Sequence, residues 1–383
     1  MAKRDGQTTG KGASRTNSRI VAKFGSKLLT SGGGQLDGAV LADLVRQVST
    51  LVAGGSQVAV VTSGAVAVGR DRAANPELER DISDRQVLAA IGQSRLVERY
   101  DTLLQEHGLM AAQALLTRAD LSQRNGYLNA RNTIDALLQL GVVPIINEND
   151  VVADEELRGG AFGENDSLSA LVANLIDADL LVMLSDVGGL YRSDPRSDPA
   201  AELIREVADV DAVAAHAGPP GRGGRGGMRA KVEAARLATG TGTTVVIANG
   251  READALLRIA SGESLGTRFA PGASRTESRK RWMLSGLGSG GGRLVVDEGA
   301  VQALRRNGRS LLPAGVVSVE GAFERGDTVA VEDGAGERLA VGICNYGAEE
   351  VARILGQRSD RIEELLGYRY GDEVIHRDNL VIL

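Results

Sequence analysis

Small and polar residues directly follow several short apolar runs, and their types suit the binding of an acidic ligand. The first run, Ile20–Phe24, contains Lys23 and is followed by Gly25-Ser26. A lysine in an apolar strand is costly to bury without an anionic partner, and glycine allows close backbone approach. The pattern therefore favours an anion at the strand end, while a lysine that extends to solvent from a strand edge is the structural alternative.

The second run ends in Thr62-Ser63-Gly64-Ala65, where a helical pattern begins. Ser63 and the amides after it could bind a carboxylate or a phosphate at the helix N-terminus. Ser63 could equally act only as the helix N-cap.

Two clusters of acidic and amide residues come next, at Asn147–Asp150 and Gly163–Asp166. Either cluster alone has an ordinary explanation, because Asn and Asp are common in turns and Asp166 could cap the helix it opens. Their closeness in sequence favours a shared binding site.

A glycine-rich segment, Gly218–Lys231, precedes another helical pattern. Its amides could bind phosphates, with Lys231 adding a mobile positive charge, or it could be a flexible solvent loop. It lacks the Gly-Lys-Ser/Thr ending of the Walker motif, and no G-x-G-x-x-G follows the first strand.

The elements that carry these residues alternate between strand and helix patterns. We expect buried strands at Ile20–Phe24, Gln57–Val61, Met110–Leu116, Val142–Ile146, Leu180–Leu184 and Thr244–Ala248, and helices at about Asp37–Val52, Asp84–His107, Leu128–Leu140, Ser167–Ile176 and Met228–Ala238. This alternation predicts an α/β fold, a mostly parallel sheet covered by helices on both faces. Ligands bind beyond the carboxyl ends of such strands, where the polar residues above and Ser185-Asp186 lie.

The pattern predicts two domains. Residues 1–18 read as a disordered tail, 19–270 as the α/β domain and 271–291, with its Gly286–Gly292 stretch, as a linker. Residues 292–377 contain short strand patterns at Arg293–Val296, Val316–Glu320, Thr328–Val331 and Leu339–Cys344, with short helices at Glu298–Arg306 and Ala348–Ile354. They predict a smaller, strand-rich domain.

Composition excludes several classes of protein. The net charge of −6 and the 3% aromatic content argue against a globally basic or base-stacking nucleic-acid binder. One cysteine, Cys344, and three histidines do not favour a disulfide framework, a Cys-based zinc site or a His-rich metal centre. With no apolar stretch of 18 residues and no secretory signal pattern, we expect a cytoplasmic protein without a membrane span.

Taken together, the motifs resemble the amino acid kinase superfamily and, within it, the glutamate 5-kinases. The resemblance covers about residues 19–377 in collinear order. It is carried by Lys23–Ser26, Thr62–Ala65, Leu115–Asp120, Ile146–Asp150, Gly163–Asp166, Tyr191–Pro195, Gly226–Lys231 and Arg279–Trp282. Residues Val296–Ala300 and Ser310–Pro313 make the C-terminal part similar to a PUA domain, a small β-barrel.

The resemblance implies ATP-dependent phosphorylation of the γ-carboxylate of L-glutamate, the first step of proline biosynthesis. Lys23 and Lys231 would stabilise the transferring phosphoryl group from two sides, with Asp166 holding both ammonium groups in place. Substrate glutamate would be bound by Ser63, Asp150, Asn165 and Asn147. No general base is required, because the γ-carboxylate is already ionised at neutral pH.

For the nucleotide, the resemblance implies contacts from Lys23, Ser185, Asp186 and the run Arg225, Gly226, Gly227, Met228, Arg229, Ala230 and Lys231. Mg²⁺ would accompany ATP mainly through phosphates and water rather than through a protein metal site. It also implies feedback inhibition by proline and a homo-oligomer.

The sequence departs from the family pattern in three places. Glu164 stands where Asp is usual, Arg225 stands where Thr is usual, and the segment 151–162 is a few residues longer. Two other functions remain open: another kinase of this fold, acting on aspartate, acetylglutamate, carbamate or a nucleoside monophosphate, and an RNA-binding protein that uses the PUA-like domain. The near-balanced charge of residues 293–377 disfavours RNA binding.

Overall fold

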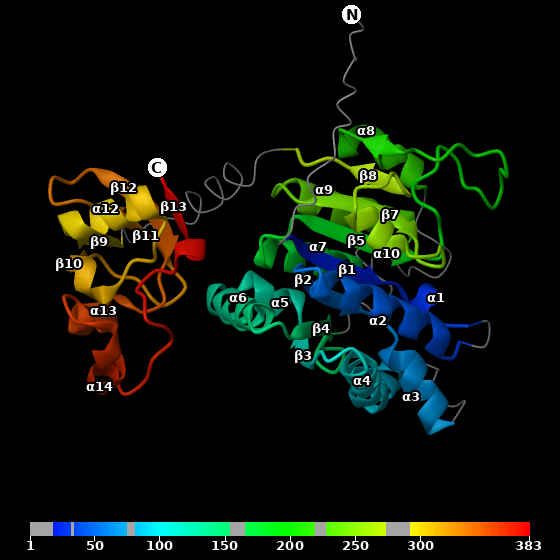
Figure 1. Ribbon diagram of the computed structural model, residues 1–383, viewed down its shortest axis with the longest axis horizontal. Helices are drawn as coiled ribbons and strands as arrows, with labels where there is room; N and C mark the ends of the chain where they lie inside the picture. The colour runs from blue at the N-terminus through cyan, green and yellow to red at the C-terminus, as the bar shows by residue number, and fades with distance from the viewer. Residues whose placement is uncertain (1–17, 32–33, 75–80, 154–164, 219–226, 273–291) are drawn as a thin grey trace, which may run out of the picture.

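The computed structural model of the chain describes residues 18–31, 34–74, 81–153, 165–218, 227–272 and 292–383 (Figure 1). Several predictions lie outside these residues. They concern the tail up to residue 17, Glu164, Arg225, Gly226, the linker from residue 273, the motif Arg279–Trp282 and most of the segment 151–162.

The larger sheet has eight strands in the order β3-β4-β2-β1-β5-β7-β8-β6. Its parallel strands are β1 (Arg19–Phe24), β2 (Gln57–Thr62), β3 (Ala111–Leu116), β4 (Val143–Glu148), β5 (Leu180–Ser185) and β7 (Thr244–Asn249). At the far edge, β8 (Thr267–Phe269) runs antiparallel to β7 and pairs with the short β6 (Glu206–Val207). All six predicted strands are present.

Helices cover both faces of this sheet, and the alternation along β1 shows how. Ile20, Ala22 and Phe24 belong to the core beneath α2 (Gly38–Ala53), α4 (Ile82–Gln105) and α10 (Ala255–Ala260). Val21 faces the other way, into the core beneath α6 (Arg124–Gln139), α7 (Asn165–Leu175) and α9 (Met228–Thr239). The predicted three-layer α/β fold is confirmed, and α1 (Ser26–Leu29), α3 (Ala65–Ala73), α5 (Arg118–Ser122) and α8 (Val210–Val213) lie in its connections.

Strand ends differ slightly from the prediction. The apolar run before Asn147 predicts that this residue follows the strand, but β4 continues through Asn147 and Glu148. The reason is pairing, because Leu115 and Leu116 of β3 lie opposite these two residues and extend the parallel ladder beyond the apolar run.

The second domain is built on a five-stranded sheet in the order β10-β9-β11-β12-β13. The strands are β9 (Arg293–Val296), β10 (Val316–Glu320), β11 (Thr328–Glu332), β12 (Arg338–Ile343) and β13 (Leu380–Ile382). The resemblance predicts a small barrel-like domain. In the described residues its strands form a five-stranded sheet, in which β10 and β13 are the edge strands. α12 (Glu298–Asn307), α13 (Ala348–Ile354) and α14 (Ile362–Leu366) accompany the sheet, and its own apolar core includes Leu294, Val331 and Tyr346.

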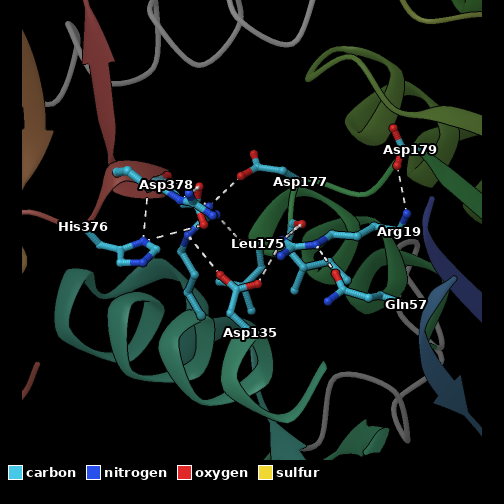
Figure 2. Close-up of polar contacts among 11 residues, drawn as sticks. Arg19, Gln57, Asp135, Leu175, Asp177, Asp179, His376 and Asp378 are labelled. Atoms are coloured by element: carbon cyan, nitrogen blue, oxygen red, sulfur yellow. Dashed lines mark hydrogen bonds and ion pairs between the residues drawn. The ribbon is translucent and has the colours of Figure 1, made fainter. Parts of the chain in front are cut away.

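The two domains contact each other through α6. Leu128 of α6 is buried in a small apolar cluster with Val341, Ile343 and Val381 of the C-terminal domain. Beside it, the buried Arg131 donates to the backbone oxygen of Asp378 at 3.0 Å. Figure 2 labels Asp378 close to Asp177 and Asp135 of the α/β domain. No described helix is long and apolar enough to span a membrane.

Candidate active site

Two lysines and one aspartate from three separate elements meet at the carboxyl edge of the larger sheet. Lys23 Nζ lies 2.6 Å from Asp166 Oδ1, and Lys231 Nζ lies 2.9 Å from Asp166 Oδ2. Lys23 and Asp166 are fully buried, and Lys231 is 7% exposed. The structure therefore brings together the three residues predicted as catalytic, which are separated by up to about two hundred positions in the chain.

Strand alternation explains how Lys23 reaches this cluster. Like Val21, Lys23 points to the sheet face that α7 and α9 cover, where Asp166 and Lys231 lie in the first turns of those helices. Because Lys23 is completely buried, it does not extend to solvent. Asp166 lies inside the helix rather than at its cap, and its two carboxylate oxygens form ion pairs with the ammonium groups of Lys23 and Lys231.

The cluster carries one net positive charge, since two ammonium groups surround one carboxylate. Burial alone would raise the pKa of Asp166, but the charges of Lys23 and Lys231 outweigh burial and hold this pKa at about 2. Asp166 is thus ionised at neutral pH, and the surplus positive charge suits an anion such as a phosphoryl group. Gly25 lies directly beside the Lys23 amine, because a Cβ added at this glycine would lie 3.7 Å from Lys23 Nζ.

Next to the cluster, the residues predicted to bind substrate form a hydrogen-bonded group. Asn165 Nδ2 lies 2.8 Å from the backbone oxygen of Thr62, 3.1 Å from Ser63 Oγ and 2.9 Å from Asn147 Oδ1, and its two hydrogens are shared among these three acceptors. Ser63, Asn147 and Asn165 are each at most 2% exposed. Ser63 is not the N-cap of α3, because Gly64 holds that position with φ of 113°.

Asp150 lies in the turn after β4 and is 8% exposed. Burial, aided by the negative charge of Glu148, raises the pKa of Asp150 to about 7. Its Oδ1 atom is buried and has no hydrogen-bond partner in the described part of the chain. Such a carboxylate is suited to receive a cationic group from a ligand.

The residues predicted to bind nucleotide are only partly described. Ser185 is buried at the end of β5 and accepts from the amide of Val187, whereas Asp186 is exposed. Gly227 precedes α9, and in its first turn Met228 is half-buried, Arg229 exposed and Ala230 buried.

Three contacts escaped the sequence analysis, and all come from α4. Gln93 accepts from Asn147 Nδ2 at 2.8 Å, Gln86 donates to the backbone oxygen of Asp150 at 2.9 Å, and Tyr100 hydrogen-bonds the Thr62 hydroxyl at 2.7 Å. A glutamine or tyrosine on the inner face of an amphipathic helix is ordinary, so the residue types alone did not mark these positions. The seven-residue spacing of the two glutamines, which puts them on one face, was the only available clue.

In the described residues, no group of three or more His, Cys, Asp or Glu side chains is placed to hold a metal ion.

Two protein families match separate parts of the chain. Residues 18–249 match the Amino acid kinase family, and residues 292–366 match the PUA domain. The chain is 50% identical over 367 residues to a glutamate 5-kinase of Dehalococcoides mccartyi, covering 95% of this chain and 98% of that one. It is 52% identical to the glutamate 5-kinase of Herpetosiphon aurantiacus, an alignment that covers 95% of this chain and 98% of that one. It is 49% identical to the glutamate 5-kinase of Chromohalobacter salexigens, covering 99% of this chain and 100% of that one.

Proposed function

Because the chain belongs to the glutamate 5-kinases of the amino acid kinase family, we propose that it transfers the γ-phosphoryl group of ATP to the γ-carboxylate of L-glutamate. A carboxylate oxygen forms a bond to the γ-phosphorus while the bond from that phosphorus to the β,γ-bridging oxygen breaks. The products are γ-glutamyl phosphate and ADP. The single observation that carries this proposal is the buried Asp166 carboxylate bound by two lysines beside a cluster of amides.

The two lysines take the central role. Phosphoryl transfer depends on positioning and on compensating charge that spreads over the moving group. Lys23 and Lys231 are fixed by Asp166 before any ligand binds, so little reorganisation is needed when charge shifts from carboxylate to phosphoryl to ADP. Asp166 is accordingly a positioning residue, and no proton has to be removed from the ionised glutamate.

Glutamate would bind beside them. Its ammonium group would pair with Asp150, and its α-carboxylate would accept from Ser63 and nearby amides, which directs the γ-carboxylate to the lysines. ATP would lie along Ser185, Asp186 and the segment Arg225–Lys231. Mg²⁺, coordinated mainly by the phosphates and water, would compensate phosphate charge.

The activity can be tested by trapping the acyl phosphate with hydroxylamine in the presence of ATP and Mg²⁺. We expect hydroxamate from L-glutamate and far less from aspartate or N-acetylglutamate, with a matched release of ADP. Hydroxamate from aspartate but not from glutamate would refute the substrate assignment. Lys231→Met is expected to reduce kcat by roughly 10²–10³.

We also propose that proline inhibits the enzyme by competing for the glutamate site, on the basis of family membership and of the ammonium-binding character of Asp150. Initial rates at several glutamate concentrations should show a KM that rises with proline at constant kcat. Rates unchanged by millimolar proline would contradict this.

A further inference from the structure

A continuous chain of side-chain amides crosses the carboxyl edge of the sheet from α7 to α4. Asn165 of α7 donates to Asn147 of β4, and Asn147 Nδ2 donates to Oε1 of Gln93 of α4. This chain links two helices that cover opposite faces of the sheet.

One backbone carbonyl group fixes which end of each side-chain amide, oxygen or NH₂, faces the next amide in the series. The carbonyl oxygen of Thr62 can only accept, so Asn165 must present its NH₂ group there. Asn147 must then present Oδ1 to Asn165 and its own NH₂ group to Gln93. Gln93 consequently presents Oε1 to Asn147, which leaves its Nε2 donor as the last group of the hydrogen-bonded series.

Within the described parts of the chain, that terminal donor has no hydrogen-bond partner. Gln93 Nε2 is buried and lacks a hydrogen bond to any described residue, as do the acceptors Asn165 Oδ1 and Asp150 Oδ1. Buried polar groups are normally paired, so unpaired ones call for a ligand that supplies both an acceptor and a donor. A zwitterionic amino acid supplies both, through its carboxylate and its ammonium group.

Tight helix packing fixes the position of Gln93. A Cβ added at the neighbouring Gly92 would lie 1.9 Å from the backbone oxygen of Ala65 in α3, so only glycine allows the two helices to approach this closely. Two turns earlier on the same face of α4, Gln86 donates to the backbone oxygen of Asp150. α4 thus contacts both ends of the polar run Asn147–Asp150, which spans the end of β4 and the turn after it.

We propose that Gln93 is a substrate-binding residue that donates through Nε2 to the α-carboxylate of the amino acid, while its Oε1 holds the Asn147 amide. This inference rests on the proposed function and extends it by assigning a group of the substrate. The γ-carboxylate is directed to the two lysines and the ammonium group to Asp150. The α-carboxylate is the remaining charged group. Among the described side-chain amides beside Ser63, Gln93 Nε2 is the donor without a partner, so it joins Ser63 in binding this carboxylate.

The test uses Gln93→Glu, which keeps the acceptor for Asn147 but replaces the terminal donor by a negatively charged oxygen. We expect the KM for glutamate to rise roughly tenfold to a hundredfold, with the KM for ATP and the melting temperature little changed. Gln93→Met removes the donor without adding charge and should raise the same KM. Ser94→Glu adds the same charge at the adjacent exposed position and should leave kinetics unaltered.

A truncated substrate separates binding from a purely structural role. 4-Aminobutyrate is glutamate without the α-carboxylate, so the ratio of its KM to that of glutamate measures what that carboxylate contributes. We expect this ratio to fall about tenfold or more in Gln93→Glu relative to the unaltered protein, as in a double-mutant cycle. An unchanged ratio would overturn the assignment, whereas failure of the unaltered protein to phosphorylate glutamate would instead refute the proposed function.

Discussion

Asp166 organises the site at the scale of single residues, because both of its oxygens are occupied by lysines that belong to different elements. Without its charge, two ammonium groups would face each other in a buried place. The carboxylate therefore stabilises the fold and fixes the geometry of the lysines together.

We expect Asp166→Asn to reduce kcat by roughly 10²–10³ and the free energy of unfolding by about 3–5 kcal/mol. ADP release and urea unfolding measure the two effects. Asp211→Asn is the matched control, because Asp211 is an exposed partner of Arg236 and should cost about 0.5 kcal/mol or less. A variant at Asp166 with normal kcat would contradict the positioning role.

Asp150 should make glutamate binding depend on pH. Its pKa is raised to about 7, chiefly by burial, and only the ionised form attracts the substrate's ammonium group. The KM for glutamate should therefore be constant above pH 8 and rise about tenfold for each pH unit below 7, following the loss of the ionised form. In Asp150→Asn the KM should be high at every pH, and a persisting pH dependence in that variant would assign the titration to another group.

At the scale of elements, close packing between α3 and α4 positions the α4 side chains that contact the ends of β2 and β4. α3 and α4 pack closely against each other at Gly69 and Gly92, since a Cβ at Gly69 would lie 1.8 Å from the backbone oxygen of Leu88. This contact holds α4, and with it Gln86, Gln93 and Tyr100, against the ends of β2 and β4.

Gly92→Ala should therefore push α4 away from α3. We expect a loss of about 1–3 kcal/mol in the free energy of unfolding from overpacking, together with a higher KM for glutamate. Gly38→Ala is the control, because Gly38 is exposed at the start of α2 and a Cβ there meets nothing within 4 Å. Equal stability of the two variants would show that the helices adjust without cost.

Arg131 connects the two domains at the scale of the whole molecule. Its guanidinium donates to the backbone oxygen of Leu175 at the end of α7, to Asp177 and to the backbone oxygen of Asp378 in the C-terminal domain (Figure 2). Burial acts to lower the pKa of Arg131, but the carboxylates of Asp177 and Asp135 raise it above its ordinary value. Since α7 begins with Asn165 and Asp166, a single helix joins the domain interface to the site.

We expect Arg131→Met to lower the free energy of unfolding by about 3 kcal/mol, because it leaves carboxylates without their buried partner. The two domains should also melt in separate steps in calorimetry. Arg124→Met is the matched control, since Arg124 pairs with Asp327 across the same interface but is half-exposed, and should cost about 1 kcal/mol or less. A single unshifted transition for Arg131→Met would contradict a role in domain docking.

By itself, the sequence determined the six parallel strands and the helices α2, α4, α6, α7 and α9 of the α/β domain, since apolar runs and helical periodicity depend on neighbouring residues. The short edge strands β6 and β8 and the helix α10 were not predicted. It also identified Lys23, Ser63, Asn147, Asp150, Asn165, Asp166 and Lys231 as candidates. Strand ends and the helices that follow them meet at one edge of a parallel sheet, and the family resemblance gave these residues their roles. It could not reveal Gln93, Gln86 or the Arg131 contacts. Their roles depend on which helix face meets which strand end, and only the packing of segments distant in the chain decides that.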